Sequence, residues 1–229
     1  MAKTRNDPRL SVNKLAQYVT SRAGRQNQIL RNAKYPPDYI TAYYRDAAEA
    51  ISRFIGGGMS DLGILDRMTL KLLQSESSNI QQDRQKSANV DAIETFANML
   101  DDIDLRGATP SLGAHAAPHI SVAGVAISIR PDIILRSEKK GAPLVGALKL
   151  HFPRSEPLDE EQAGYISALL HRFAADHLLD EGTASTAHCV VIDISSAKFY
   201  PGVASVKKRM ADIEGSCGHI AQLWPSIVP

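Results

Sequence analysis

Two charged residues stand on neighbouring apolar segments, where their side chains could act together on a phosphodiester. Asp132 ends one alternating, β-branched segment, and Lys149 lies in the middle of the next, at 143–152. The stretch between them holds the turn-forming residues 137–141, so the two segments suit a β-hairpin that brings the carboxylate towards the ammonium group. A carboxylate can hold Mg²⁺ or Mn²⁺, and a lysine beside the metal can stabilise negative charge on a reacting phosphate.

The same residues resemble the core motif of a known group of nucleases. Pro131-Asp132 and Ala147-Leu148-Lys149 are similar to the PD and (D/E)xK elements of the PD-(D/E)xK superfamily, which has the restriction-endonuclease-like fold. The resemblance covers the chain from about residue 90 to about residue 195. It implies a central mixed sheet flanked by helices, a Mg²⁺ or Mn²⁺ cofactor and a nucleic-acid substrate.

One position departs from the family pattern. Ala147 stands where the family carries a second carboxylate, two residues before Lys149 and therefore on the same face of the strand. In some family members the acid moves to another element, and three residues are candidates here: Glu94, Glu161 and Asp193. Glu94 is the favoured replacement, because members often place a glutamate on a helix before the sheet. Glu161 is more simply an acid at the start of a helix.

The helix after the lysine strand adds two residues to the resemblance. Gln162 and Tyr165 resemble a Q-x-x-(x)-Y element that one branch of the superfamily carries on this helix. The resemblance therefore implies five site residues, of which Asp132 and Glu94 would bind the metal: Asp132, Lys149, Glu94, Gln162 and Tyr165.

Each of these residues also has a simpler interpretation. A Pro-Asp pair at a strand end often forms only a turn, and Lys149 alternates with leucines as a solvent-facing lysine would. His151 is more typical of a surface or core-rim histidine than of a ligand. Gln162 and Tyr165 fit a helix-surface amide and an aromatic residue at the edge of the core.

The pattern of apolar residues predicts the elements that would position this site. Helical spacing predicts short helices within 11–56 and amphipathic helices within 59–105. Alternating stretches predict two strands, or one bent strand, at 119–135 and a further strand at 143–152. A long helix, an apolar strand and closing helices follow. This order predicts an α/β or α+β fold with a mixed sheet covered by helices.

The N-terminal region is basic, although the whole chain is nearly neutral. Residues 1–56 carry ten Lys or Arg and four Asp or Glu, while the formal net charge of the chain is +1. Such a region can contact nucleic-acid phosphates or can simply be a solvated basic face. We expect a basic helical region at 1–58, in which Asp38 would cap the third helix. A restriction-endonuclease-like α/β domain would follow at 59–229.

Bulk composition limits the class of protein. Hydrophobic residues make up 44% of the chain and charged residues 22%, which is ordinary for a globular protein. No apolar run approaches the roughly 20 residues that a membrane helix needs, and the N-terminus lacks the apolar core of a signal peptide. The two cysteines suggest neither a disulfide framework nor a zinc site. The sequence predicts a cytoplasmic protein with no membrane partner.

Three functions remain open from sequence. The first is a nuclease that cleaves DNA with Mg²⁺ or Mn²⁺. The second keeps the fold without the chemistry, as a binding or scaffold module for which a homodimer is one arrangement. The third is a regulator whose N-terminal helices bind DNA while the α/β part senses a ligand. A second acid close to Asp132 and Lys149 would favour the first function, whereas a Lys149 alone in bulk water would exclude it.

Overall fold

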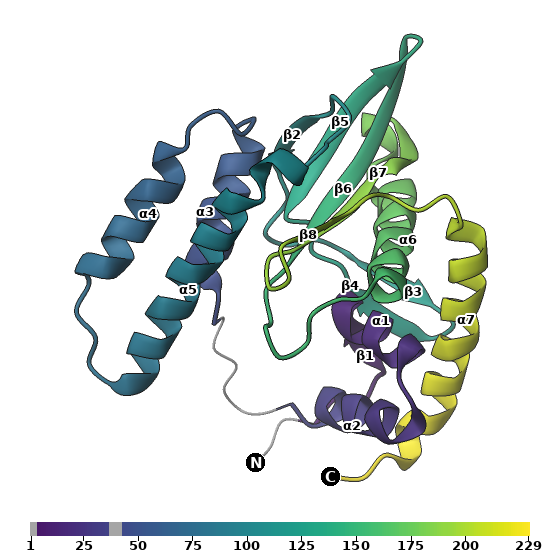
Figure 1. Ribbon diagram of the computed structural model, residues 1–229. Coiled ribbons are helices and arrows are strands. Elements are labelled where there is room, and N and C mark those ends of the chain that lie inside the picture. The colour runs from purple at the N-terminus through teal and green to yellow at the C-terminus, as the bar shows by residue number, and fades with distance from the viewer. Residues whose placement is uncertain (1–3, 37–42) are drawn as a thin grey trace.

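The chain folds into mixed β-sheets with helices on both faces (Figure 1). The structure is a computed structural model that describes residues 4–36 and 43–229. The helix cap predicted at Asp38 lies outside these residues, and the described part of the third helix begins at Arg45. The predicted α/β architecture, with a central mixed sheet flanked by helices, is confirmed.

The larger sheet has five strands in the order β2-β5-β6-β7-β8. Only β6 and β7 are parallel, and α6 (Glu160–His177) joins them as a crossover, while the other neighbours are antiparallel. The strands are β2 (Thr109–Leu112), β5 (Ile133–Lys139), β6 (Ala142–His151), β7 (Thr183–Asp193) and β8 (Lys198–Tyr200).

A smaller sheet accounts for most of the segment predicted as one bent strand or two. Its order is β1-β4-β3, and its strands are β1 (Arg9–Ser11), β3 (His119–Val122) and β4 (Val125–Ser128). The stretch 119–135 therefore contributes to three strands in two sheets. Ala123 and Gly124 have positive φ and form the turn between β3 and β4. Pro131 lies between β4 and β5, where its missing N–H suits a break in pairing.

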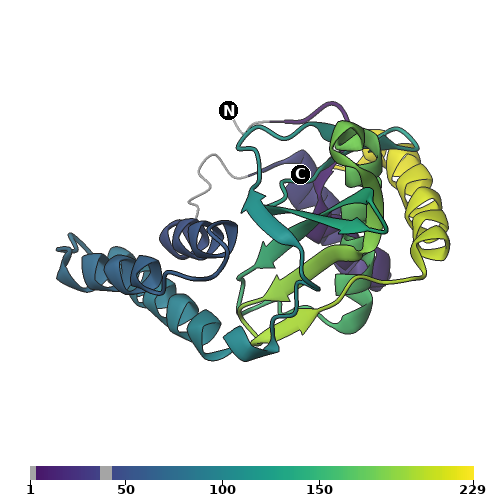
Figure 2. The same ribbon diagram turned by 90° about the horizontal axis from the view of Figure 1, so that it is seen from above.

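Helices cover the two faces of the larger sheet from different parts of the chain (Figures 1 and 2). We call the two sides the α6 face and the α5 face. The helices that share a core with the α6 face are α1 (Val12–Thr20), α2 (Ala23–Lys34), α6 and α7 (Val206–Leu223). Those on the α5 face are α3 (Arg45–Gly56), α4 (Gly63–Gln74) and α5 (Ile80–Asn98). Short 3₁₀ turns follow at Leu100–Asp102, Leu179–Glu181 and Trp224–Ser226.

The predicted boundary at residue 58 does not coincide with a boundary in packing. Leu15, Tyr18 and Ile29 of the first two helices are buried in the same cluster as residues of α6 and α7. Phe54 of α3 packs instead in the cluster of the α5 face. The described part of residues 1–58 is thus divided between two cores, because α1 and α2 pack in the cluster of the α6 face whereas α3 packs in that of the α5 face.

A buried lysine ties the second helix to the end of the described chain. The Lys34 ammonium group donates hydrogen bonds to the carbonyl oxygens of Trp224 at 2.7 Å, Pro225 at 3.2 Å and Ile227 at 3.0 Å. All three of its donors are therefore satisfied without a carboxylate. The indole N–H of Trp224 donates to the Arg5 carbonyl oxygen at 3.2 Å. The backbone N–H of Arg5 donates in turn to the Lys34 carbonyl oxygen at 2.9 Å.

The helices differ from membrane-spanning helices in length and apolar character. Within residues 4–36 and 43–229, none combines the length and the apolar character needed to cross a bilayer.

Candidate functional site

The hairpin of β5 and β6 brings Asp132 and Lys149 into direct contact. Lys149 Nζ donates to Asp132 Oδ2 at 2.6 Å, and the backbone N–H of Leu150 donates to the same oxygen at 2.7 Å. The register explains the contact, because Ile133 pairs with Leu148 and the preceding residue therefore lies opposite Lys149. The turn is shorter than the five residues predicted. The strands continue to Lys139 and Ala142, and only 140–141, both with positive φ, connect them.

The pair lies largely inside the protein. The side chains are 15% exposed for Lys149 and 21% for Asp132, so the interpretation of Lys149 as a solvent-facing strand residue does not hold. Alternation along β6 directs Leu148 and Leu150 into the α5-face core and Lys149 towards the α6 face. Asp132 Oδ1 accepts no hydrogen bond from the described residues, so this oxygen is available to a cation or to solvent.

The position of the missing acid is part of the core. Ala147 is fully buried, and its neighbours in the sheet are Ile134 on β5 and Cys189 on β7. These residues belong to the cluster of the α6 face. Burial raises the pKa of the Cys189 thiol to about 12, which makes it a neutral, hydrophobic neighbour. Ala147 therefore fills a small apolar space beside the pair.

Glu94 lies on the opposite side of the sheet from the pair. Its helix, α5, buries Ile93 and Phe96 against the α5 face, in the cluster that contains Leu148. Glu94 itself is exposed. Asp132 and Lys149 point towards the α6 face, so the predicted partnership of Glu94 with Asp132 is not formed in this arrangement. The helical spacing of apolar residues within 59–105 predicted a helix here, but it could not show which face of the sheet α5 covers.

The two other candidate acids also have different surroundings. Asp193 is fully buried and accepts four hydrogen bonds: from the N–H of Leu158 (2.8 Å) and the hydroxyl of Ser196 (2.9 Å), and from the N–H (2.9 Å) and hydroxyl (2.7 Å) of Ser195. It organises the connections at the end of β7. Glu161 is exposed in the first turn of α6. In the part of the chain that the structure describes, no cluster of three or more His, Cys, Asp or Glu side chains could hold a metal.

Gln162 and Tyr165 join α6 to its neighbouring helices. Gln162 forms a capping box with Asp159, the residue before the helix, and its Nε2 donates to the Thr20 hydroxyl of α1 at 3.2 Å. Tyr165 donates to Asp212 Oδ2 of α7 at 3.2 Å. Burial, and then the charge of Asp212, raise the pKa of Tyr165. The structure explains both residues by helix packing, and none of their described hydrogen bonds reaches the Asp132–Lys149 pair.

The comparisons with known proteins add no family to this geometry. Neither the models of known protein families nor the curated proteins give a match. The candidate site is therefore defined by the contacts within the chain. Of the predicted site, the fold brings together Asp132 and Lys149. Asp132 Oδ1, which accepts no hydrogen bond from the described residues, is the atom of this pair that suits a cation.

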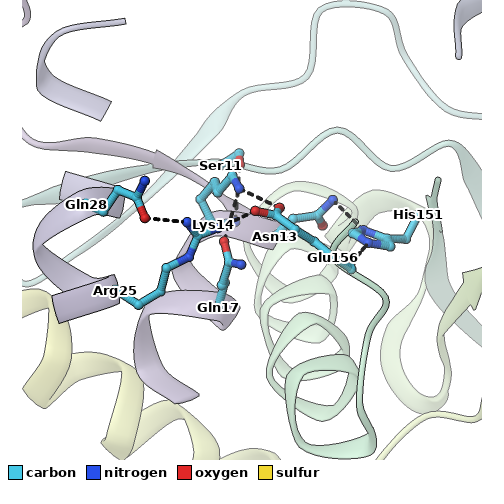
Figure 3. Close-up of polar contacts among 8 residues, drawn as sticks. All are labelled: Ser11, Asn13, Lys14, Gln17, Arg25, Gln28, His151 and Glu156. Atoms are coloured by element: carbon cyan, nitrogen blue, oxygen red, sulfur yellow. Dashed lines mark hydrogen bonds and ion pairs between the residues drawn. The ribbon is translucent and has the colours of Figure 1, made fainter. Parts of the chain in front are cut away.

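A second polar cluster, which the sequence did not reveal, lies near the end of β6 (Figure 3). His151 is 4% exposed, and its Nε2 is 2.7 Å from the carbonyl oxygen of Glu156. A carbonyl only accepts, so Nε2 carries the proton, and Nδ1 accepts from Asn13 Nδ2 at 3.2 Å. Burial lowers the pKa of His151, although the Glu156 carbonyl opposes this shift. His151 lies two residues after Lys149 on β6, so its side chain also points towards the α6 face.

Glu156 connects three separate elements at this place. Its carboxylate forms ion pairs with Lys14 Nζ of α1, at 2.7 Å, and with the guanidinium group of Arg25 of α2 (Figure 3). Glu156 itself lies in the connection between β6 and α6. Burial would raise the pKa of Glu156, but the hydrogen bond and charge of Lys14, together with the charge of Arg25, hold it below its usual range. We call Lys14, Arg25 and Glu156 the Glu156 clamp.

Four histidines predict how stability depends on pH. Desolvation lowers the pKa of each of them: the buried His151 and His188, the half-buried His171 and the exposed His119. The unfolded chain, with histidine values near 6.5, then binds protons more readily than the folded chain. Stability should therefore be highest above pH 6.5 and decrease as the pH falls towards the lowered folded values. The buried His151 contributes to stability with this sign.

Urea unfolding at about pH 7.5 and about pH 5.5 measures this effect, at pH values where most carboxylates stay ionised. His151→Gln should reduce the difference between the two conditions. A wild-type stability that is equal at both pH values, or higher at the lower one, would contradict the lowered pKa values of these imidazoles.

Proposed function

We propose that this chain is a nuclease-like protein that acts on DNA phosphodiesters, with the Asp132–Lys149 pair at the centre of its site. The observation that carries the proposal is the direct 2.6 Å contact of these two side chains on paired strands, as the resemblance to the PD-(D/E)xK superfamily implies. The parallel β6–α6–β7 unit within a mixed sheet supports the same family. A cytoplasmic location belongs to this proposal.

The donor set of the site fits a divalent cation only in part. Asp132 Oδ1 offers one hard, charged oxygen, whereas Ala147 offers none. One carboxylate is enough for Mg²⁺ when substrate phosphate oxygens supply further ligands. Bound there, Mg²⁺ or Mn²⁺ would withdraw negative charge from the phosphate. The residues of the chain would do the rest: Asp132 would hold the cation, and Lys149 would stabilise charge that develops on the phosphate.

A second candidate function follows from the buried Ala147. Glu94 lies on the other face of the sheet, and Asp193 is occupied by backbone and hydroxyl donors. If no substrate oxygen completes the ligand set, the pair is a structural ion pair in a nuclease-like fold that binds DNA without cutting it. The basic residues of β1, α1 and α2 would then supply phosphate contacts.

Cleavage assays with the purified protein separate the two candidates. Supercoiled plasmid, linear duplex and single-stranded DNA would be incubated with Mg²⁺, with Mn²⁺ or with EDTA. We expect cleavage that requires the metal and that Asp132→Asn strongly reduces, because an amide oxygen is a poorer ligand for a hard cation. Asp101→Asn, at an exposed aspartate after α5, is the matched control and should cleave like the wild type.

The failure of cleavage also has a defined meaning. Wild-type protein that cuts none of these substrates but binds DNA with a strong salt dependence would favour the second candidate. Equal cleavage by the wild type and Asp132→Asn would remove Asp132 from the site. Substitutions are preferred to deletion of the N-terminal helices, since Leu15 and Phe54 of those helices belong to the two cores.

A further inference from the structure

A cavity of about 470 Å³ lies between β1, α1 and α2, next to the Glu156 clamp. It shares Ser11 and Lys14 with a smaller cavity of about 160 Å³ that is lined by His151 and Glu156. Lys14 and Arg25, which line the larger cavity, form ion pairs with Glu156, which lines the smaller one (Figure 3). Neither Asp132 nor Lys149 lines the larger cavity, so the proposed nuclease site does not account for it.

The walls of the larger cavity are strongly basic. Among the described residues, four cationic side chains and no acidic one line it: Arg5, Arg9, Lys14 and Arg25. Glu156, which pairs with Lys14 and Arg25, lines the smaller cavity instead. Arg9 is exposed and makes no side-chain hydrogen bond or ion pair with the described residues, while the guanidinium group of Arg5 donates only to the Ala33 carbonyl, at 3.3 Å. The cavity thus has more positive charge than its surroundings neutralise, which favours an anion.

The other walls are apolar. Leu10, Ile29 and Pro36 are buried and face the cavity together with Ala33, while Ser11 and Asn32 add two neutral polar groups. A volume of this size falls in the range of small-molecule sites. An inorganic ion alone would make no contact with the apolar part of the wall. The combination therefore suits a ligand with an anionic end and an organic body.

We propose that this cavity binds a nucleotide through a terminal phosphate monoester, either free or at the 5′ end of a DNA strand. The arginine guanidinium groups would hold the phosphate, because their planar donors match its oxygens, and the apolar walls would contact the sugar and base. Lys14 and Arg25 would add charge from the side of the Glu156 clamp. The strand-end form rests on the proposed function, whereas the free-nucleotide form is independent of it.

Calorimetric titration in the presence of EDTA tests binding separately from cleavage. The probes are deoxyadenosine 5′-monophosphate, deoxyadenosine, inorganic phosphate, and a short single-stranded oligonucleotide with either a 5′-phosphate or a 5′-hydroxyl. We expect saturable binding of the monophosphate and much weaker binding of deoxyadenosine and of inorganic phosphate. Preference for the 5′-phosphorylated strand over the 5′-hydroxyl strand would identify the strand end as a source of the ligand, and its absence, with the monophosphate bound, would identify the free nucleotide.

Two arginine variants with one matched control locate the binding site. Arg9→Gln and Arg25→Gln should each weaken monophosphate binding by about tenfold or more, the scale of one lost charge-assisted hydrogen bond. Arg22→Gln removes an exposed cation of the same region that does not line the cavity, and it should bind like the wild type. Arg9→Gln decides the outcome, because Arg9 is exposed and makes no side-chain hydrogen bond or ion pair with the described residues whose loss could unfold the protein.

Three results would overturn the proposal. The first is the absence of saturable binding by any probe that carries a terminal phosphate. The second is equal binding by the wild type and Arg9→Gln. The third is an equal loss in Arg9→Gln and Arg22→Gln, which would indicate a general attraction of polyanions to a basic surface. Failure of DNA cleavage, by contrast, would leave the binding of the free nucleotide unchanged.

Discussion

Replacing Lys149 by alanine should lower metal-dependent DNA cleavage by about 10²-fold, the scale seen when one preorganised charge-stabilising group is removed. The substitution deletes the ammonium group that lies 2.6 Å from Asp132 Oδ2, and leaves that oxygen with the N–H of Leu150 as its described donor. Because the pair is only 15–21% exposed, the variant should also lose roughly 1–3 kcal/mol of stability. Cleavage must therefore be measured well below the unfolding temperature of each protein.

Lys139→Ala is the matched control for this experiment. Lys139 lies on the same hairpin, at the exposed end of β5, so its loss should change cleavage and stability little. Combining Lys149→Ala with Asp132→Asn should reduce cleavage hardly further than either change alone, since the two residues act as a unit. Fully additive losses, or cleavage by Lys149→Ala at the wild-type rate, would show that the pair is not the reacting centre.

Gly113→Ala should destabilise the protein by about 2–4 kcal/mol and disturb the same site from the backbone. A Cβ atom at Gly113 would lie 2.0 Å from the carbonyl oxygen of Pro131 and 3.2 Å from the carbonyl carbon of Asp132. The Gly113 N–H also donates to the Asp132 carbonyl oxygen at 2.9 Å. The added methyl group must therefore push the end of β2 away from the segment that carries Asp132, so cleavage should fall together with stability.

Gly215→Ala provides a control that has the opposite sign. Nothing lies within 4 Å of a Cβ atom at Gly215, which is inside α7, so alanine should stabilise this helix by up to about 1 kcal/mol. Urea unfolding of both variants, followed by cleavage assays, measures the contrast. If Gly113→Ala is as stable as the wild type, the contact between β2 and the Pro131–Asp132 peptide is looser than the structure indicates.

The part of the site that could be predicted from sequence is the part that depends on one hairpin. Asp132 and Lys149 are close in the chain, and strand alternation alone places them on one face. The replacement of the missing acid was beyond such reasoning, because it depends on which face of the sheet α5 covers. Gln162 and Tyr165 were found on the expected helix, but their roles depend on contacts with Thr20 and Asp212, far away in the sequence.

Long-range pairing also explains why the fold was predicted only in outline. β1 has three residues, too few for a periodic pattern, and its partner β4 is more than a hundred positions away. The pairing draws α1 and α2 into the core of the α6 face, which is why the expected N-terminal region is not a separate unit. The basic cavity and the Glu156 clamp arise from this same packing, so the sequence showed their charges but not their arrangement.

The buried ammonium group of Lys34 has a consequence for the order in which the chain folds. A ribosome makes α2 long before it makes Trp224, Pro225 and Ile227, whose carbonyl oxygens accept the three hydrogen bonds of that group. β1 must likewise wait for residues 126–128. Until then the apolar faces of α1 and α2 lack part of the core they pack against, and a chaperone could protect these segments of the nascent chain. Co-translational folding can therefore begin with the helices of the α5 face, while β1, α1 and α2, which precede them in the chain, reach their final positions later.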